Sequence, residues 1–456
     1  MIYDVIKQKG GADWEAEILR SGIMSAEDTF KGEEAENITY YISESGDDGN
    51  VGTSHEKPIR TFEKVMSLPL KKGDRVLLER GSVFRIGEKL IIKVNGVYFG
   101  AYGKGEKPLV SGSLRDYASP EIWVKSDAPD IWQLSLRTLS AGIITFDHEK
   151  SFGTWHYTFD GLKSDGDFFH DTENGIFYLY YSKGNPGKCF ENIEISTTDA
   201  AFRASHITGF YVENIFFKHF TFGAFHIGEI HDVLVQGCVV GWSGGKFFRI
   251  DKNGTPTRYG NAFQVWNFGR NITVRNCLVY QQFDAALTFQ GFGEDTSYFE
   301  NIRFEDNLME YSSMNFEFWA DKSKKGTVPH ISGISVCRNI IRFAGYGWSG
   351  EIRYKKENQA AILGWNYRYS DLSDFLIKDN IIDCADCRMI YIALPDEQKG
   401  LKVLQNSFYQ KKATGRHDYT EIISNRPETK AHNQYEFEKA VKLFDTNPKK
   451  VIWVDG

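Results

Sequence analysis

The sequence predicts an all-β fold, a right-handed parallel β-helix in which short strands stack as successive coils of a solenoid. Between Lys218 and Phe408 the chain repeats one phrase, an alternation of apolar and polar residues around a small polar pivot. Internal repetition with a strand in each copy is typical of solenoids. The pivots are 18 to 41 residues apart, too irregular for propeller blades of roughly 40 to 50 residues, and they fall at His219, Gly237, Asn276, Asn307, Asn339, Asn380 and Asn406.

Asparagine suits the corner of such a coil for two reasons. It tolerates the left-handed backbone region, and its side chain bonds to nearby backbone. When coils stack, each asparagine amide can continue a ladder of hydrogen bonds to the next. The Leu-x-x-Leu-x-Leu pattern of leucine-rich repeats is absent. The remaining alternative to a β-helix is a β-sandwich with asparagine-rich turns.

The first 110 residues divide into an arm and the start of the solenoid. Residues 1–36 are polar, with a helical pattern over Asp13–Arg20, and we expect an arm that packs on the body. Thr39–Ser43 reads as a strand, and Pro58 is placed to begin a helix that runs to Ser67. Gly73–Gly81 then reads as a strand and turn, so residues 37–110 form the first part of the β-helix.

The repeated phrase disappears between residues 111 and 195, which predicts an inserted small β-sandwich-like subdomain. This segment holds the pair Asn174-Gly175 between two β-rich runs, a strong hairpin signal. The phrase returns near Ala200, and we expect the β-helix to occupy residues 196–456.

Composition limits the classes of partner. The net charge is −7 and no basic tract occurs, which argues against nucleic acid. The chain has no apolar run of about 18 residues, so no membrane span is predicted. The start of the chain lacks a signal-peptide pattern. Cys384 and Cys387 form a C-x-x-C without a second pair, so a structural role is favoured over metal or redox chemistry. We expect a cytoplasmic protein with reduced cysteines and no cofactor or metal; a homo-oligomer is compatible with the sequence.

Strand alternation identifies the side chains that face outward, because neighbours on a strand point to opposite faces. If Ala285, Leu287 and Phe289 point inward, the strand presents Asp284, Ala286, Thr288 and Gln290 to the outside. If Met314, Phe316 and Phe318 point inward, the next coil presents Asn315, Glu317, Trp319 and Asp321. Earlier coils would present His226, Gln264 and Trp266.

Alignment of these two coils on the pivots Asn276 and Asn307 stacks Asp284 on Asn315 and Ala286 on Glu317. The two acids are then diagonal neighbours, with Cα atoms roughly 8 Å apart. Two carboxyl groups flank a glycosidic bond at about 5 to 5.5 Å in retaining enzymes and about 6.5 to 9.5 Å in inverting ones. Asp284 and Glu317 are therefore the candidate catalytic pair.

Carbohydrate is the expected substrate, and the surrounding residues supply its contacts. Trp266 and Trp319 offer stacking surfaces, while Gln264, Gln290 and Asn315 can bond hydroxyl groups. Further candidates are His226, Arg258 on a long connection after Trp242, and Trp365.

Two segments of the chain resemble known families. The order of strand, loop, helix beginning near Pro58 and Gly-Asp-Arg-Val-Leu-Leu-Glu-Arg-Gly over residues 73–81 resembles the N-terminal cap of pectate-lyase-like β-helices. The run Phe283-Asp-Ala-Ala-Leu-Thr-Phe-Gln290, followed one coil later by Phe-Glu-Phe-Trp, resembles the β-xylosidases of glycoside hydrolase family 120. The second resemblance implies a retaining hydrolase with Asp284 as nucleophile and Glu317 as general acid/base. The excursion from Gly291 to Phe299 is longer than that pattern.

Two other functions stay open. A polysaccharide lyase of the pectate-lyase type would use arginine or lysine as base, often with Ca²⁺ held by several carboxylates. The pattern predicts no outward cluster of three acids and no arginine or lysine inside the candidate strands, but Lys246, Arg258 and Arg353 lie on loops or strand ends from which they could reach the site. A non-catalytic glycan-binding or structural solenoid would tolerate replacement of Asp284 and Glu317.

Overall fold

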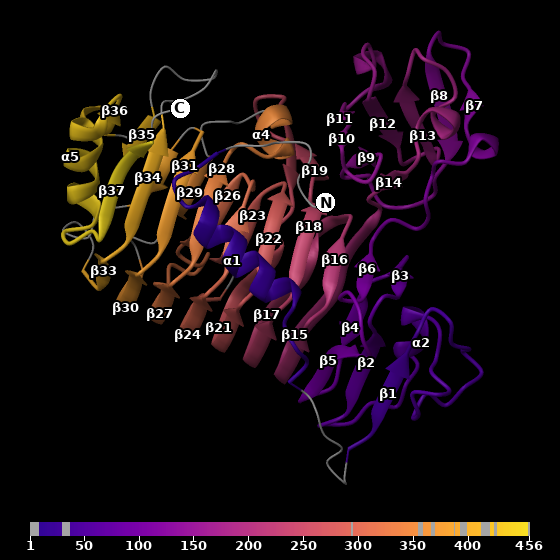
Figure 1. Ribbon diagram of the computed structural model, residues 1–456, viewed down its shortest axis with the longest axis horizontal. Helices are drawn as coiled ribbons and strands as arrows, with labels where there is room; N and C mark the ends of the chain where they lie inside the picture. The colour runs from indigo at the N-terminus through magenta and orange to yellow at the C-terminus, as the bar shows by residue number, and fades with distance from the viewer. Residues whose placement is uncertain are drawn as a thin grey trace.

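A computed structural model shows a parallel β-helix, and it describes residues 9–29, 37–292, 295–353, 359–365, 370–386, 388–392, 399–411, 420–423 and 426–454 (Figure 1). One face of the helix is a ten-stranded sheet in which the strands follow one another in chain order. Its strands are β3 (Val83–Arg85), β6 (Leu109–Ser111), β16 (Phe216–Lys218), β18 (Val239–Ser243), β22 (Leu278–Gln282), β25 (Leu308–Glu310), β28 (Ile340–Ala344), β31 (Ile381–Ala385), β34 (Ser407–Lys411) and β37 (Lys450–Val454).

A seventeen-stranded sheet forms the rest of each coil. Its long strands run through a bend at a left-handed residue: β15 (Thr198–Glu213) at His206, β17 (Phe220–Gln236) at Glu229 and β21 (Phe263–Arg275) at Asn267. Later coils divide the same path into two strands each. These are β23 (Ala285–Gly291) and β24 (Tyr298–Glu305), β26 (Met314–Ala320) and β27 (His330–Cys337), β29 (Ala360–Trp365) and β30 (Asp371–Lys378), and β32 (Arg388–Tyr391) and β33 (Leu401–Leu404), with β35 (Thr420–Ile423) after them.

The interior is filled by ladders of apolar side chains from successive coils. One ladder follows the strand register from coil to coil, and every member is buried: Phe202, Phe225, Phe263, Leu287, Phe316 and Ile362. Because the side-chain period of a strand is two, inward Leu287 and Phe289 fix the outward direction of Thr288, which lies between them, and of Gln290, which follows them. The predicted alternation is confirmed for these residues.

The predicted asparagine ladder is present and buried. Asn307, Asn339, Asn380 and Asn406 stack on four coils, and each of the first three donates from its backbone N–H and Nδ2 to the Oδ1 of the next at 2.9 to 3.0 Å. Each Nδ2 also bonds a backbone carbonyl, such as that of Phe304 from Asn339 at 2.8 Å. The ladder therefore satisfies buried backbone groups at this corner.

The pivot alignment was wrong by one residue. The residue with positive φ is not the ladder asparagine but the residue before it, as in Asp306 and Arg338. Asn276 has φ +50° and lies level with Asp306, while Cys277 lies level with Asn307 and donates its N–H to Asn307 Oδ1 at 3.0 Å. His219 lies at a different corner, level with Trp242.

Both ends of the solenoid are covered. At the N-terminal end, β1 (Thr39–Ile42), β2 (Arg75–Glu79), β4 (Leu90–Ile92) and β5 (Val97–Tyr102) precede the first complete coil. The helix α2 (Phe62–Val65) is shorter than predicted, because its N-cap is Thr61 and not a residue near Pro58. At the C-terminal end, α5 (Gln434–Phe444) closes the core, and Asp445 Oδ2 accepts the last hydrogen bonds of the ladder, from Asn406, at 2.9 Å.

The helix α1 (Asp13–Met24) lies across the outer face of the ten-stranded sheet (Figure 1). It buries Ala16 and Ile23 against this sheet, and Arg20 forms an ion pair with Glu310 at 2.9 Å. None of the helices in the described ranges is long and apolar enough to cross a membrane.

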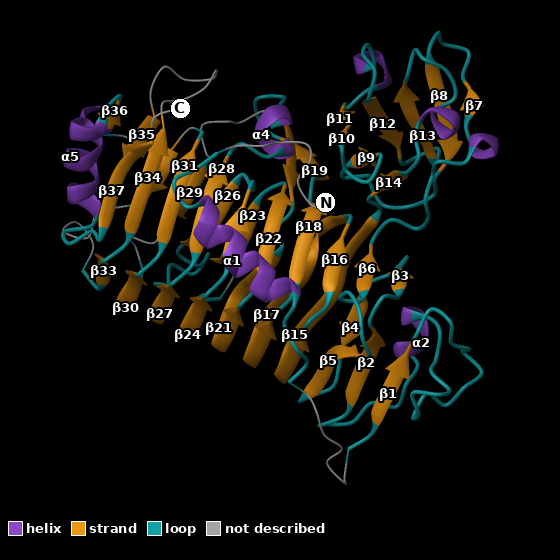
Figure 2. Cartoon of the chain, viewed as in Figure 1, coloured by secondary structure: helices purple, strands orange, loops and turns teal. Residues whose placement is uncertain are grey.

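The segment between β6 and β15 forms separate small sheets beside the solenoid (Figure 2). Its strands are β7 (Val124–Lys125), β8 (Ile131–Ser135), β9 (Ile144–Phe146), β10 (Ser151–Phe152), β11 (Thr154–Trp155), β12 (Asp167–Asp171), β13 (Ile176–Tyr180) and β14 (Ile193–Ile195). The hairpin of β12 and β13 turns at Asn174-Gly175, with Gly175 at φ +69°, as predicted.

Candidate active site

Two ladders of outward side chains cross the same face of the solenoid, and together they form what we call the outer wall. The first ladder consists of Arg203, His226, Gln264, Thr288, Glu317, Leu363 and Tyr391. The second consists of Ser205, Trp266, Gln290 and Trp319, and the strand register places the backbone of Gly228 and of Trp365 in the same row. Each neighbouring pair in a ladder is separated by one strand spacing of about 4.8 Å.

The register within this wall differs from the pivot alignment. Thr288, and not Ala286, is level with Glu317, and Ala285 is level with Met314. One residue of the difference comes from the misassigned pivot, and another from a corner that is one residue longer between β22 and β23 than between β25 and β26. Asp284 therefore lies just before β23, at the corner, rather than beside Asn315.

Glu317 is a buried carboxyl group on the outer wall. Its Oε2 accepts hydrogen bonds from Gln290 Nε2 and, at 3.4 Å, from Thr288 Oγ1. Burial and then the negative charge of Asp284 raise its pKa to about 8, against the opposing effects of Arg353, Gln290 and Thr288. The group is therefore protonated at neutral pH, as a general acid must be.

Asp284 is the second buried acid, and an ion pair holds it in place. Arg353 donates from Nη1 to Asp284 Oδ1 at 2.7 Å, and the same atom bonds Phe283 O at 3.1 Å and Ser313 Oγ at 3.2 Å. Because Asp284 raises the pKa of Glu317 through its charge, the two groups act on each other across neighbouring coils.

Arg353 lies at the C-terminal end of α4 (Trp348–Ile352), which places it at this corner. Trp348 is fully buried, and its indole N–H donates to Gln281 O at 2.8 Å, which anchors the helix against β22. Nothing local in the sequence marked Arg353 as the partner of Asp284, since about 70 residues of chain separate them.

An apolar floor adjoins the two acids. Ala285, Met314, Ala360 and Leu363 form a small buried cluster, separate from the main core, with Tyr391 packed against it. The prediction that Ala285 and Met314 point into the main core is therefore wrong, and Ala286, predicted to face outward, belongs to the main core. Trp266 and Trp319 are half-buried, and their rings meet edge to face at 5.8 Å.

The end of the first ladder away from Tyr391 is basic. His226 stacks on Phe222 at 4.9 Å, and burial lowers its pKa, which Arg203, Lys89 and Lys246 lower further. Asp199 opposes them and bonds Lys89 at 2.7 Å and Lys246 at 2.6 Å. His226 and Gln264 thus lie on the wall where the alternation placed them.

Two predicted contacts are not on this surface. Asn315 has no exposed area and donates from Nδ2 to Arg342 O at 2.8 Å, because β26 places it at the buried corner. Arg258 is buried as well: its guanidinium bonds the carbonyls of Gly142 and Gly245 and lies 4.7 Å from the Trp155 ring centroid. It fastens the inserted subdomain to the solenoid instead of facing a substrate.

Other predictions fall partly outside the described residues. Trp365 occupies its row by strand register, but its side chain is not described, nor are the residues that follow it. Cys387 of the C-x-x-C lies outside the described residues, while Cys384 is a buried free thiol. Among described residues, no group of three or more metal-binding side chains gathers.

The wall and the adjoining corner together present a protonated glutamate, an aspartate paired with arginine, two tryptophans and amide groups. This set can donate a proton, attack or stabilise a developing cation, stack on a flat apolar face and bond hydroxyl groups. Thr288 and Leu363 are the neighbours of Glu317 on the wall. The sequence pattern does not place them beside Glu317, because that requires the observed strand register.

No family model and no curated protein matches this chain. Among solved structures, the chain is similar to XylC in its complex with xylose, with a TM-score of 0.51 and 11% identity over 85% of this chain and 72% of that chain. Pectate lyase Pel9A matches with a TM-score of 0.44 and 11% identity, over 86% and 74% of the two chains. A lacto-N-biosidase from Eubacterium ramulus matches with a TM-score of 0.33 and 13% identity, over 91% and 66%. The first similarity establishes a shared fold.

Proposed function

We propose that this protein is a retaining glycoside hydrolase that acts on short oligosaccharides, with Asp284 as nucleophile and Glu317 as general acid/base. The observation that carries the proposal is the buried, protonated Glu317 on the outer wall, whose pKa is raised in part by the charge of Asp284 at the adjoining corner, where Asp284 pairs with Arg353. Two carboxyl groups in such unequal environments are what the two roles require.

In the first step, Glu317 protonates the glycosidic oxygen while Asp284 attacks the anomeric carbon. The bond to the leaving sugar breaks, and a covalent glycosyl ester forms on Asp284. Glu317, now a carboxylate, then removes a proton from water, which attacks the same carbon and releases Asp284. The hydrogen bonds from Gln290 and Thr288 stabilise the Glu317 carboxylate between the two steps.

The other wall residues position the sugar. Trp266 and Trp319 provide aromatic faces for its apolar side, and Gln264 lies one coil from Thr288 with its amide on the same wall. The fold shared with XylC, whose structure contains xylose, supports a β-xylosidase-like activity.

A panel of aryl glycosides, β-xylosides among them, together with uronate polymers tests the proposal. Release of the aryl alcohol by the parent, with loss in Asp284→Ala, supports a hydrolase. An unsaturated uronate product would instead identify a lyase. Glycan binding without either product would identify a non-catalytic solenoid.

A further inference from the structure

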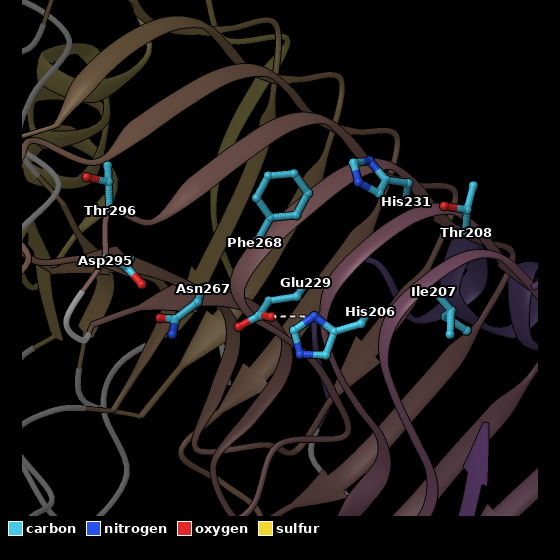
Figure 3. Close-up of a pocket in the computed structure, with 9 residues that line it drawn as sticks. All are labelled: His206, Ile207, Thr208, Glu229, His231, Asn267, Phe268, Asp295 and Thr296. Atoms are coloured by element: carbon cyan, nitrogen blue, oxygen red, sulfur yellow. Dashed lines mark ion pairs between the residues drawn. The ribbon is translucent and has the colours of Figure 1, made fainter. Parts of the chain in front are cut away.

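A depression of about 680 Å³ lies where the long strands bend, directly after the residues that β15, β17 and β21 contribute to the second ladder (Figure 3). Three of its polar residues are the left-handed bend residues of successive coils, His206, Glu229 and Asn267. Asn267 directly follows Trp266, and the bend turns the chain onto the neighbouring face of the solenoid. The depression is therefore distinct from the site around Glu317.

The polar groups of this depression are held in place. His206 Nδ1 and Glu229 Oε2 form an ion pair at 2.8 Å, and Asn267 Oδ1 accepts from the backbone N–H of Phe292 at 2.9 Å. Figure 3 shows these three side chains gathered on one side of the depression. Asp295, on the excursion after Gly291, also lines the depression, lies beside Asn267 in Figure 3 and pairs with Lys325 at 3.0 Å.

An aromatic ring lies beside these groups. Phe268 is half-buried and stacks on Tyr298 at 5.3 Å with an interplanar angle of 16°, and Tyr298 stacks on His330 at 4.7 Å. The ring of His231 meets Phe268 nearly edge-on at 4.9 Å. The stack fixes the position of the Phe268 ring without covering it completely.

We propose that this depression is a non-catalytic binding site for one neutral sugar residue. A pyranose has an apolar face that fits against a fixed aromatic ring and hydroxyl groups that both donate and accept. A carboxylate, an amide and an imidazole supply both kinds of partner within one small space. The His206 imidazole and the Lys325 ammonium group already bond carboxylates, and Glu229 and Asp295 place negative charge at the depression, which argues against a phosphate or sulfate ligand.

The site is tested with the full-length chain by saturation-transfer NMR and calorimetry, using xylose, xylobiose, galactose and lactose as probes up to about 10 mM, a range that covers millimolar Kd values. The parent is expected to bind at least one of them. Phe268→Ala, Phe268→Leu and Glu229→Gln should each weaken that binding at least 10-fold. Phe248→Ala is the matched control and should bind as the parent does, because it removes an exposed ring from the hairpin of β19 (Lys246–Ile250) and β20 (Pro256–Tyr259), which contributes nothing to the lining of the depression.

Two further readouts separate this site from the active site. The Phe268 and Glu229 variants should keep the parent's turnover of a small aryl glycoside, whereas Trp319→Ala should keep binding in the depression. Glu229→Gln alters no packed ring, so it decides the question if Phe268→Ala fails to fold. Binding that is unchanged in both Phe268→Leu and Glu229→Gln, or no binding of any probe by the parent, overturns the proposal.

Discussion

Replacement of Glu317 by glutamine should stabilise the protein, and the gain should grow with pH. The folded chain holds a proton on Glu317 up to a pKa of about 8, while an unfolded glutamate releases it near 4.5. Between these values the folded state binds one more proton, so each pH unit of increase favours unfolding by at most about 1.4 kcal/mol. The stability that this group contributes is complete below pH 4.5 and is lost as pH rises to 8.

Glutamine has the shape of glutamate, keeps an acceptor for Gln290 and carries no charge to be desolvated or repelled by Asp284. We expect Glu317→Gln and the parent to differ little at pH 4.5. At pH 8 the variant should be more stable by about 2 to 4 kcal/mol, less than the full integral because the site relaxes and admits water.

Urea unfolding followed by tryptophan fluorescence at pH 4.5, 6, 7 and 8 measures this difference. Glu88→Gln, which removes an exposed carboxylate in the turn before β4, is the control for a simple change in net charge. A difference between Glu317→Gln and the parent that does not change with pH, or a variant less stable than the parent at pH 8, would refute the assignment of a buried protonated Glu317.

The remaining predictions concern the ion pair, the ladder and the tryptophan wall. Arg353→Gln removes a positive charge that lowers the pKa of Glu317, so the basic limb of the kcat/KM profile should move to higher pH, whereas Arg338→Gln on another face should leave it in place. Asn339→Ala leaves the buried backbone N–H of Asn307 and the carbonyl of Phe304 without a hydrogen-bond partner, which should lower the free energy of unfolding by about 3 to 5 kcal/mol. As a control, Asn253→Ala at an exposed position should lower it by less than about 0.5 kcal/mol. Trp319→Ala should raise KM for oligosaccharides about 10-fold or more through the loss of stacking, and an unchanged KM would remove this residue from the site.

The fold was predictable because it rests on local patterns. Alternation with period two identified inward Leu287 and outward Thr288, and asparagines at the corners predicted a ladder that the structure contains. The register was not predictable from the pivots, because the left-handed residue and the ladder residue are adjacent and both are often asparagine. That one-residue error, together with a corner that is one residue longer between β22 and β23 than between β25 and β26, moved Glu317 from Ala286 to Thr288.

The site was predictable in part for the same reason. Glu317, Gln290 and Trp319 follow from the alternation of single strands, whereas Asp284 depends on a corner whose geometry no pattern gives. Arg353 pairs with Asp284 from a separate helix, and Arg258 is buried because it bonds the inserted subdomain. Both are contacts between segments distant in sequence, which strand patterns do not encode.

The pairing of Asp284 with Glu317 is tested most directly by trapping the glycosyl ester. The parent is incubated with activated 2-deoxy-2-fluoro glycosides, and its peptides are then examined by mass spectrometry. We predict one stable adduct, on the peptide that contains Asp284, and none in Asp284→Asn. Turnover of the parent substrate with inversion at the anomeric carbon, or an adduct on any other carboxylate, would contradict the account.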